Sequence, residues 1–367
     1  MTPVEQIKGK RGGVGLRAYD PERAFPGFTL FAPLTGGGKV YLIDMHGEIA
    51  HSWTMPYSPG LYGHLTPHGT LLYNGKVPEE SERFIADKGW KGGAILEATW
   101  DGQVLWELRQ PDHHHDGILL RNGNVLLLCL GEVPEAVLNE LRGAYPDRTP
   151  DGPMFADYFV EMTNGGEAVW EWRSWEHLDP QMDAPMWPRE DLEEWTHGNT
   201  VFELPNGDIL TSFRDLSTIA IVDRASGEFT WRYGAPNLAQ QHAPVGLENG
   251  HILVFDNGTR RSDAFMPYSR VLEIDPATDE VVWRYEEKQN VDFFAPHLSS
   301  AQRLPNGNTL ICEGTFGRFF EVTAEGETVW EYVNPFFASP PGKPDKPVRN
   351  AVFRAYRYSA EQIAAMR

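Results

Sequence analysis

A pair of short motifs that recurs along this 367-residue chain constrains the fold more than any other feature. The first motif is a Gly or an acidic residue, then a residue that is usually Glu, then two mostly apolar residues and Trp. Its copies occupy 102–106, 166–170, 227–231, 279–283 and 326–330, and a degenerate copy occupies 47–51. Each copy follows an alternating apolar run that ends in a carboxylate. Two β-rich runs joined by a Gly-containing turn predict a hairpin.

The second motif is an Asn-Gly or His-Gly turn between two further apolar runs, and it precedes each hairpin from the second copy onward. Its glycines are Gly69, Gly123, Gly207, Gly250 and Gly307. We expect type I′ turns at these positions, which need positive φ at both central residues. The two motifs together predict a four-stranded antiparallel sheet. Six such sheets, at roughly 50 to 60 residues each, predict an all-β protein, a six-bladed β-propeller.

The first repeat, from Gly27 to Trp53, has only three expected strands, whereas the apolar run 351–358 has no sheet of its own. We therefore expect the C-terminal strand to close the first blade and remove an open edge. The predicted organisation is an N-terminal extension (1–26), a single propeller (27–358) and a C-terminal tail (359–367). Two insertions, 134–153 and 173–194, are expected to lie on one face and shape a ligand entrance.

The charge balance excludes several classes of partner. The chain has 52 acidic and 32 basic residues and a net charge of −20, so its surface repels nucleic acids and anionic lipids. No apolar run approaches the roughly 18 residues of a membrane span, and we expect no export signal in the first residues. We expect a cytoplasmic protein, a monomer or homodimer, with a small-molecule partner and neither a nucleic-acid nor a membrane partner.

Histidines recur near the start of the expected channel-lining strand in the second to sixth repeats. His115 and His242 lie eight residues before the turn glycine of their repeats, and His197 and His297 lie ten before theirs. Even offsets place side chains on one face of a strand, so these four are predicted to converge. His64 has an odd offset, but its repeat starts irregularly, so His64 can still reach the same end of the channel.

Several polar residues accompany these histidines. His114 precedes His115, and the sequence leaves open which of the two faces the channel. Arg214 offers a planar donor fork suited to a tetrahedral oxyanion such as sulfate, although a salt bridge with its neighbour Asp215 is an equal alternative. Asn199, Asp256 and Asn257 are further candidates for substrate binding.

The order of these motifs resembles the bacterial arylsulfate sulfotransferase family of six-bladed propellers, from about residue 27 to residue 332. The segments that carry the resemblance are 114–116 (His-His-Asp), 194–199 (Glu-Trp-Thr-His-Gly-Asn), 212–214 (Ser-Phe-Arg), 241–242 (Gln-His), 255–258 (Phe-Asp-Asn-Gly) and 304–310. The resemblance implies a metal-free, ping-pong transfer of a sulfuryl group between phenolic compounds. It implies that His242 is the nucleophile, that His197 and Arg214 bind the sulfate, and that His115 or His114 is an acid–base or binding residue.

Two other functions stay open at this point. Several convergent imidazoles also suit one transition-metal ion, Zn, Fe or Cu, held by His64, His115, His197, His242 and His297. Such a site predicts a hydrolase, lyase or oxidase that acts on a small aromatic or anionic substrate. The third possibility is a ligand-binding propeller without catalysis. In the sulfotransferase interpretation no cofactor is needed, and His64 and His297 join Asn199, Asp256 and Asn257 as substrate-binding residues.

Overall fold

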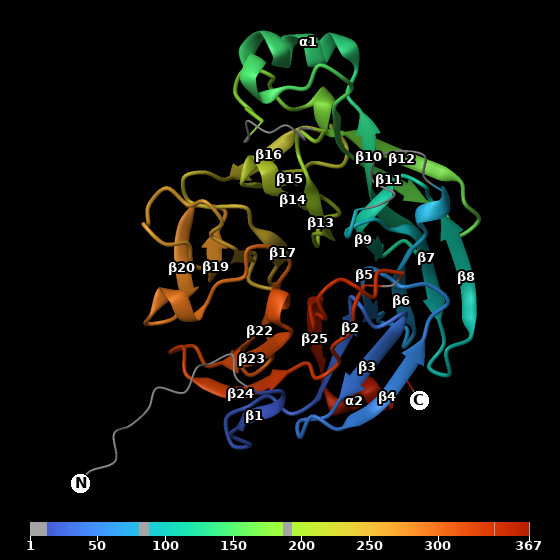
Figure 1. Cartoon of the computed structure of the whole chain (residues 1–367), viewed down its shortest axis with the longest axis vertical. Helices are drawn as coiled ribbons and strands as arrows, with labels where there is room; N and C mark the ends of the chain where they lie inside the picture. Colours follow the sequence, from blue (N-terminus) through green and yellow to red (C-terminus); the bar gives the residue numbers. More distant parts are fainter. Residues whose placement is uncertain (1–12, 81–87, 186–192, 341, 367) are drawn as a thin grey trace.

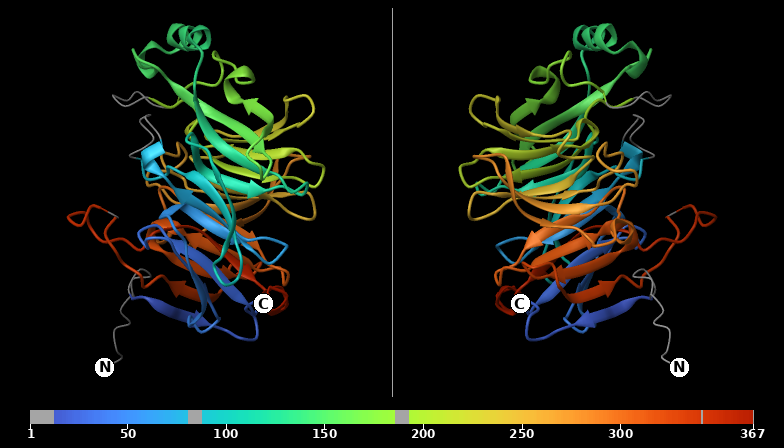
Figure 2. Two further views of the ribbon diagram at one scale, coloured as in Figure 1. Left: turned by 90° about the vertical axis from the view of Figure 1, so that its right-hand side faces the viewer. Right: turned by 90° about the vertical axis from the view of Figure 1, so that its left-hand side faces the viewer.

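The computed structural model of the protein describes residues 13–80, 88–185, 193–340 and 342–366. Within these ranges the strands form six antiparallel sheets arranged radially around a central channel (Figure 1). The prediction of an all-β, six-bladed propeller is therefore confirmed. The sheets twist like the blades of a fan when the molecule is viewed from its edge (Figure 2).

The strands of each blade follow one another from the channel outward. Blade 1 contains, in this order, β25 (Val352–Tyr358), β2 (Phe28–Pro33), β3 (Lys39–Ile43) and β4 (Ile49–Thr54). Blade 2 contains β5 (Pro59–Leu65), β6 (Leu71–Lys76), β7 (Gly93–Ala98) and β8 (Val104–Arg109). Blade 3 contains β9 (His113–Leu119), β10 (Val125–Glu132), β11 (Phe155–Met162) and β12 (Ala168–Arg173).

The remaining blades have the same arrangement. Blade 4 contains β13 (Gly198–Glu203), β14 (Ile209–Phe213), β15 (Thr218–Val222) and β16 (Phe229–Tyr233). Blade 5 contains β17 (His242–Gly246), β18 (Ile252–Asp256), β19 (Arg270–Asp275) and β20 (Glu280–Tyr285). Blade 6 contains β21 (Ser300–Arg303), β22 (Thr309–Glu313), β23 (Arg318–Val322), β24 (Thr328–Val333) and, at its outer edge, β1 (Gly15–Tyr19).

Two terminal strands close the ring. β25 pairs with β2 in antiparallel register, with Phe28 opposite Tyr358 and Phe31 opposite Ala355, which confirms the predicted closure of the first blade. β1 pairs with β24 and gives blade 6 a fifth strand. The sequence analysis did not expect this strand, because Gly15–Tyr19 is short and carries neither repeat motif.

The turns of the second motif differ from the expected type I′ geometry. Only the glycine has positive φ, for example 87° at Gly123, and the preceding asparagine does not. The side-chain oxygen of Asn122 instead accepts a hydrogen bond of 3.0 Å from the backbone of Asn124. This local bond lets the asparagine keep negative φ, so one left-handed residue is enough to reverse the chain.

Tryptophans of the outer strands link neighbouring blades. In most blades the indole N–H of an outer-strand tryptophan donates a hydrogen bond to the β-turn between the third and fourth strands of the next blade. The donors and acceptors are Trp53 to Thr99, Trp172 to Gly227, Trp231 to Asp279, Trp283 to Ala324 and Trp330 to Met45. The last bond joins blade 6 to blade 1, so it closes the ring at the periphery as β25 does at the channel.

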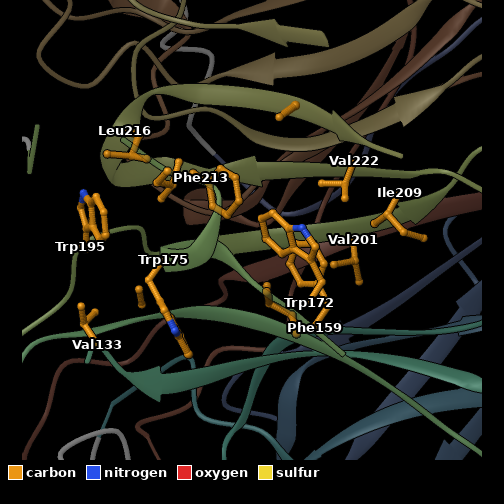
Figure 3. Close-up of a cluster of buried hydrophobic side chains, with 14 of the residues drawn as sticks. Val133, Phe159, Trp172, Trp175, Trp195, Val201, Ile209, Phe213, Leu216 and Val222 are labelled. Atoms are coloured by element: carbon orange, nitrogen blue, oxygen red, sulfur yellow. The ribbon is translucent and has the colours of Figure 1, made fainter. Parts of the chain in front are cut away.

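A large apolar cluster between blades 3 and 4 anchors two segments that matter for the site. Phe159 and Trp172 stack at its centre with ring centroids 4.7 Å apart (Figure 3). Trp195 and Leu216 lie at the end of the same cluster that is nearer the loops. Each lies two residues from a predicted site residue, His197 and Arg214 respectively, so packing of this cluster fixes the backbone that carries both residues.

The helical elements lie outside the blades. In the described parts of the chain the α-helices are α1 (Glu135–Ala144) and α2 (Ala360–Ala364), and the 3-10 turns are η1 (Pro78–Glu80), η3 (Pro146–Arg148), η4 (Ser174–Glu176), η5 (Arg214–Leu216), η6 (Asn290–Asp292) and η7 (Gly314–Phe316). α1 belongs to the first predicted insertion and lies at the periphery beyond β10 (Figures 1 and 2). Among the residues described, none of the helices has the length and apolarity that crossing a membrane requires.

Replacing Trp330 by Phe tests the link between the last and first blades. Trp330 is fully buried and its indole donates a 2.9 Å hydrogen bond to the carbonyl of Met45. We expect a loss of about 2 kcal/mol in the free energy of unfolding, because the variant leaves that carbonyl without its partner and a gap in the core. Trp283→Phe is the matched control, since the same bond sits on a half-buried ring. Denaturant unfolding that gave equal losses for both variants would contradict the account.

Candidate functional site

The innermost strands begin with residues in the left-handed backbone region. Non-glycine residues adopt positive φ in five blades, at Leu61 (116°), His115 (49°), His197 (49°), Ala243 (50°) and Leu298 (65°). Such conformations are uncommon outside glycine and are found where surrounding structure enforces them. The strand pairings are irregular at the starts of β5, β9, β13 and β17. The histidine side chains are therefore placed by these bulges and not by the even spacing along a regular strand.

His115 faces the other histidines, whereas His114 points into blade 3. The ring of His115 lies 5.0 Å from that of His197, edge to face. Trp90 stacks on His115 with ring centroids 5.3 Å apart and also contacts His197 edge-on. His114 is completely buried, with its Nε2 3.0 Å from Asp157 Oδ1. The sequence left open which of these two neighbours faces the channel, and in the structure it is His115 that faces the other histidines.

His242 is held in one orientation by Asn257. The Nδ1 atom of His242 lies 2.7 Å from Asn257 Oδ1. The amide nitrogen of Asn257 donates to the carbonyls of Ala295 (2.8 Å) and Leu298 (3.0 Å), so its oxygen must face the imidazole. An amide oxygen only accepts, and the proton of neutral His242 therefore sits on Nδ1 and leaves a lone pair on Nε2.

The histidines differ in charge because their neighbours differ. Burial and the positive charge of Arg214 lower the pKa of His242 well below its usual value. Burial also opposes the charged form of His197, but Glu194 outweighs it through its charge and a 2.8 Å contact with Nδ1, and raises the pKa of His197. The surroundings therefore favour the neutral imidazole at His242 and shift His197 in the opposite direction, toward the protonated form.

Arg214 completes what we call the histidine site, which consists of His115, His197, His242 and Arg214. Its Nη1 lies 2.7 Å from Asp215 and its Nη2 donates to Gln240 at 3.0 Å. Its Nε is buried and has no hydrogen-bond partner among the residues that the structure describes. The salt bridge with Asp215, which was one of the two alternatives for Arg214, is therefore present. It leaves the Nε–H of the guanidinium without an acceptor in this part of the chain.

Residues 68–335, which are more than half of the chain, match the family model described as Arylsulfotransferase (ASST). The chain belongs to the arylsulfotransferase family. No curated protein sequence shows significant similarity to it.

Solved structures share the fold of this arylsulfotransferase family member at low sequence identity. A protein of unknown function from Bacteroides caccae is 14% identical with a TM-score of 0.53, over 91% of this chain and 99% of that chain. A streptogramin B lyase structure is 12% identical with a TM-score of 0.49, over 89% and 84%. An inactive virginiamycin B lyase from Staphylococcus aureus with quinupristin is 11% identical with a TM-score of 0.47, over 87% and 88%. The likeness to the Bacteroides caccae protein supports the propeller fold.

Two of the predicted histidines have surroundings that differ from those of the histidine site. His297 has an exposed side chain, but partial enclosure of its ring, followed by the positive charges of Arg214 and Arg349, lowers its pKa. The charge of His297 in turn contributes to the lowered pKa of His242, so His297 lies at the rim of the histidine site. His64 stacks on Tyr62 with ring centroids 5.7 Å apart, next to Tyr356. Burial lowers the pKa of His64 to about 4. Its ring lies in a separate polar layer of the channel, built around Arg354.

The other predicted substrate-binding residues are buried and bonded within the protein. Asn199 donates to the carbonyl of Gln241 at 2.8 Å and accepts from Thr200 at 2.9 Å. Both oxygens of Asp256 are occupied, one by the backbone of Ala239 and the other by Arg261 and Arg270. Their polar atoms are thus engaged within the protein, and the direct contact of these residues with a substrate stays a prediction.

Five residues around the histidine site were not predicted from the sequence. Trp90 comes from a loop without a motif, and Phe353, whose ring lies 6.1 Å from His115 and 6.2 Å from His242, comes from the closing strand. Asp157 and Arg354 lie in strands whose neighbours look like ordinary core. Only Glu194 gave a signal, because it stands three residues before His197 inside the second predicted insertion. Residues 186–192 of that insertion lie outside the described residues.

The residues proposed for a metal do not surround one point. In the described parts of the chain, no group of three or more His, Cys, Asp or Glu side chains is placed to hold one metal ion. His64 contacts the Tyr62 layer, and the Nδ1 atoms of His197 and His242 face Glu194 and Asn257. The five-histidine set of the metal alternative thus has no shared geometry in this part of the chain.

Glu194→Gln tests the cause of the charge on His197. Without the carboxylate, burial and Arg214 act unopposed apart from Asp215, so the pKa of His197 should fall below that of a free histidine. The proton then leaves His197 at lower pH than in the wild type. Titration of labelled histidines by nuclear magnetic resonance measures this shift. Glu193→Gln, which removes the adjacent and half-exposed carboxylate, is the control and should leave His197 unchanged; a His197 titration that did not move in Glu194→Gln would disprove the assignment.

Proposed function

We propose that this arylsulfotransferase family member transfers a sulfuryl group from an aryl sulfate to a phenolic acceptor, with Nε2 of His242 as the intermediate carrier. The observation that carries the proposal is the bond from His242 Nδ1 to Asn257 Oδ1, which places the unprotonated nitrogen toward the histidine site. A neutral imidazole with its lone pair free is the form that attacks sulfur.

The positive charges of the site suit the oxygens of a sulfate group. Arg214 keeps a buried Nε–H without an acceptor among the described residues, and the raised pKa of His197, which Glu194 sustains against burial, favours its protonated form. Both groups are already fixed by Asp215 and Glu194, so little reorganisation is needed when charge shifts toward the sulfuryl oxygens. Fixed donors of this kind are a large source of transition-state stabilisation.

Aromatic surfaces next to the reacting group favour an aryl substrate. The buried ring of Phe353 lies 6.1 Å from that of His115 and 6.2 Å from that of His242, and Trp90 stacks on His115. A phenolic ring entering beside His115 meets flat apolar surfaces that can contact its faces. The chain as a whole has a net charge of −20, so the positive groups of the site are the ones that would hold an anionic donor. A cytoplasmic location and a monomeric or homodimeric state remain predictions.

Two variants test the chemistry. His242→Ala removes the proposed nucleophile and should abolish transfer from para-nitrophenyl sulfate to a phenol. Arg214→Ala keeps the imidazole but removes an oriented cation, and the rate should fall by a factor of about a hundred or more, on the order of 3 kcal/mol in the transition state.

His251→Ala is the matched control, because His251 is paired with Glu273 on a turn of blade 5 and lies outside the histidine site. It should retain transfer. Each assay is repeated after exhaustive treatment with a chelator. Transfer that survives chelation and depends on His242 supports the proposal, whereas transfer that is lost on chelation and restored by a metal ion contradicts it.

A further inference from the structure

Behind His115 lies a chain of buried polar groups that the nucleophile and the sulfate-binding residues do not use. His115 Nδ1 is 2.8 Å from Nδ1 of His114, and Nε2 of His114 is 3.0 Å from Oδ1 of Asp157. His114 and His115 come from β9, and Asp157 comes from β11 of the same blade. All three residues are buried. This series of polar groups runs from His115 through His114 and ends at the carboxylate of Asp157 on β11.

The available donors and acceptors determine where the protons lie. The second oxygen of Asp157 accepts the backbone N–H of Gly198. Oδ1 of Asp157 and Nε2 of His114 lie 3.0 Å apart, but their contact is not aligned as a full hydrogen bond. Neither atom has another hydrogen-bond partner among the described residues. A carboxylate only accepts, so Nε2 of His114 carries a proton. When His114 is neutral, its Nδ1 accepts from His115, and Nε2 of His115 is left with a lone pair that faces the histidine site.

We propose that Asp157 and His114 form a proton store for His115, which takes the proton of the phenolic acceptor and returns it to the next aryl leaving group. The inference rests on the proposed function of His242 and adds the route of the proton to it. In this scheme His115 is the catalytic residue that touches the phenol, and His114 and Asp157 are positioning residues that act through it.

The bonds and protons balance over the two half-reactions. In the first, the lone pair of His242 Nε2 forms a bond to sulfur, the sulfur–oxygen bond to the aryl group breaks, and the aryl oxygen takes the proton of His115 Nε2. His115 then receives a proton at Nδ1 from His114, which becomes neutral. In the second, the phenol oxygen bonds to sulfur and the nitrogen–sulfur bond breaks back onto His242. The phenol proton moves to His115 Nε2, and the Nδ1 proton of His115 returns to His114.

The surrounding charges favour holding the extra proton on His114. A proton kept on His115 would face His197 and Arg214, and burial, followed by the neighbouring histidines and the charge of Arg214, lowers the pKa of His115 well below its usual value. A proton passed to His114 faces the Asp157 carboxylate at 3.0 Å. The other groups around this end are Lys91, whose ammonium is bonded to the carbonyls of Pro111 and His113, and the neutral ring of His113.

The glycine at position 198 fits the same arrangement. A Cβ on Gly198 would lie 2.7 Å from Oδ1 of Asp157 and 2.7 Å from its carboxyl carbon. The backbone of Gly198 thus approaches the carboxylate closely and holds it toward His114 through its N–H. The carboxylate is oriented by the residue that follows His197, so the proton store and the sulfate-binding histidine are built on one backbone segment.

Asp157→Asn tests the proton store. The amide oxygen can still accept from Gly198, but its NH2 group then faces His114 Nε2, which must accept. The proton of neutral His114 moves to Nδ1 and is donated to His115, so that His115 presents N–H, and no longer a lone pair, to the phenol. Transfer to phenolic acceptors should fall roughly a hundredfold, since a general base is lost.

The dependence on the leaving group separates this role from a structural one. Formation of the sulfated enzyme from para-nitrophenyl sulfate, whose leaving group needs little protonation, should change by less than about threefold. An unactivated phenyl sulfate should react roughly a hundredfold more slowly, because without the carboxylate His114 holds no second proton to pass to His115 when His115 protonates the leaving group. Asp112→Asn is the matched control, because it removes a neighbouring carboxylate that accepts from Tyr158 and is not part of the chain. It should slow both donors by less than about threefold. An equal loss for both donors in Asp157→Asn would overturn the proposal.

A readout without turnover keeps the two proposals distinguishable. Nitrogen chemical shifts of labelled histidine report which ring nitrogen carries the proton. The wild type should show a proton on Nε2 of His114, and Asp157→Asn should move it to Nδ1. Unchanged shifts would overturn the proton store even if sulfuryl transfer is observed. Changed shifts in a protein without transfer activity would uphold the store and contradict the proposed function alone.

Discussion

A buried ion pair between Arg354 and Asp116 organises the channel on which the histidine site depends. Arg354 Nη2 lies 2.9 Å from Asp116 Oδ2, and the same nitrogen donates to the carbonyl of Asn199 and the hydroxyl of Thr200. The other oxygen of Asp116 accepts from Tyr62. The four blades 1 to 4 thus meet at one guanidinium. A buried pair of this kind adds little net stability, but losing one partner strands a charge at a cost of about 3–5 kcal/mol, so it fixes how the blades are aligned.

The closing strand is the element through which this alignment reaches the site. Arg354 stands on β25 directly after Phe353, whose ring contacts His115 and His242, while Asp116 directly follows His115. Alignment of the ion pair therefore also aligns two histidines from blades 3 and 5. The neighbours of each imidazole then set its charge, with Glu194 at His197 and the Asn257 amide at His242. One ring closure serves both the fold and the placement of histidines whose pKa values are shifted in opposite directions.

The sequence predicted the repeating parts well and the unique parts poorly. Six hairpins with one missing strand led directly to the six blades and to the closure by β25, because a period of similar motifs carries its own check. The convergence of His115, His197 and His242 was expected for a reason that only partly holds, since left-handed residues and bulges break the strand parity at His115 and His197. Asp157, Phe353 and Trp90 could not be found, because a residue's role there depends on which blade or loop lies against it, and that is set by tertiary packing.

The central claim is that the sulfuryl group passes through Nε2 of His242. The direct measurement incubates the protein with an aryl sulfate radiolabelled at sulfur, in the absence of an acceptor, and maps the label after proteolysis. The account predicts label on the peptide that contains His242, its release when a phenol is added, and no label in His242→Ala. Label on the peptide of His115 or His197, or turnover with no labelled protein at any time, would contradict it.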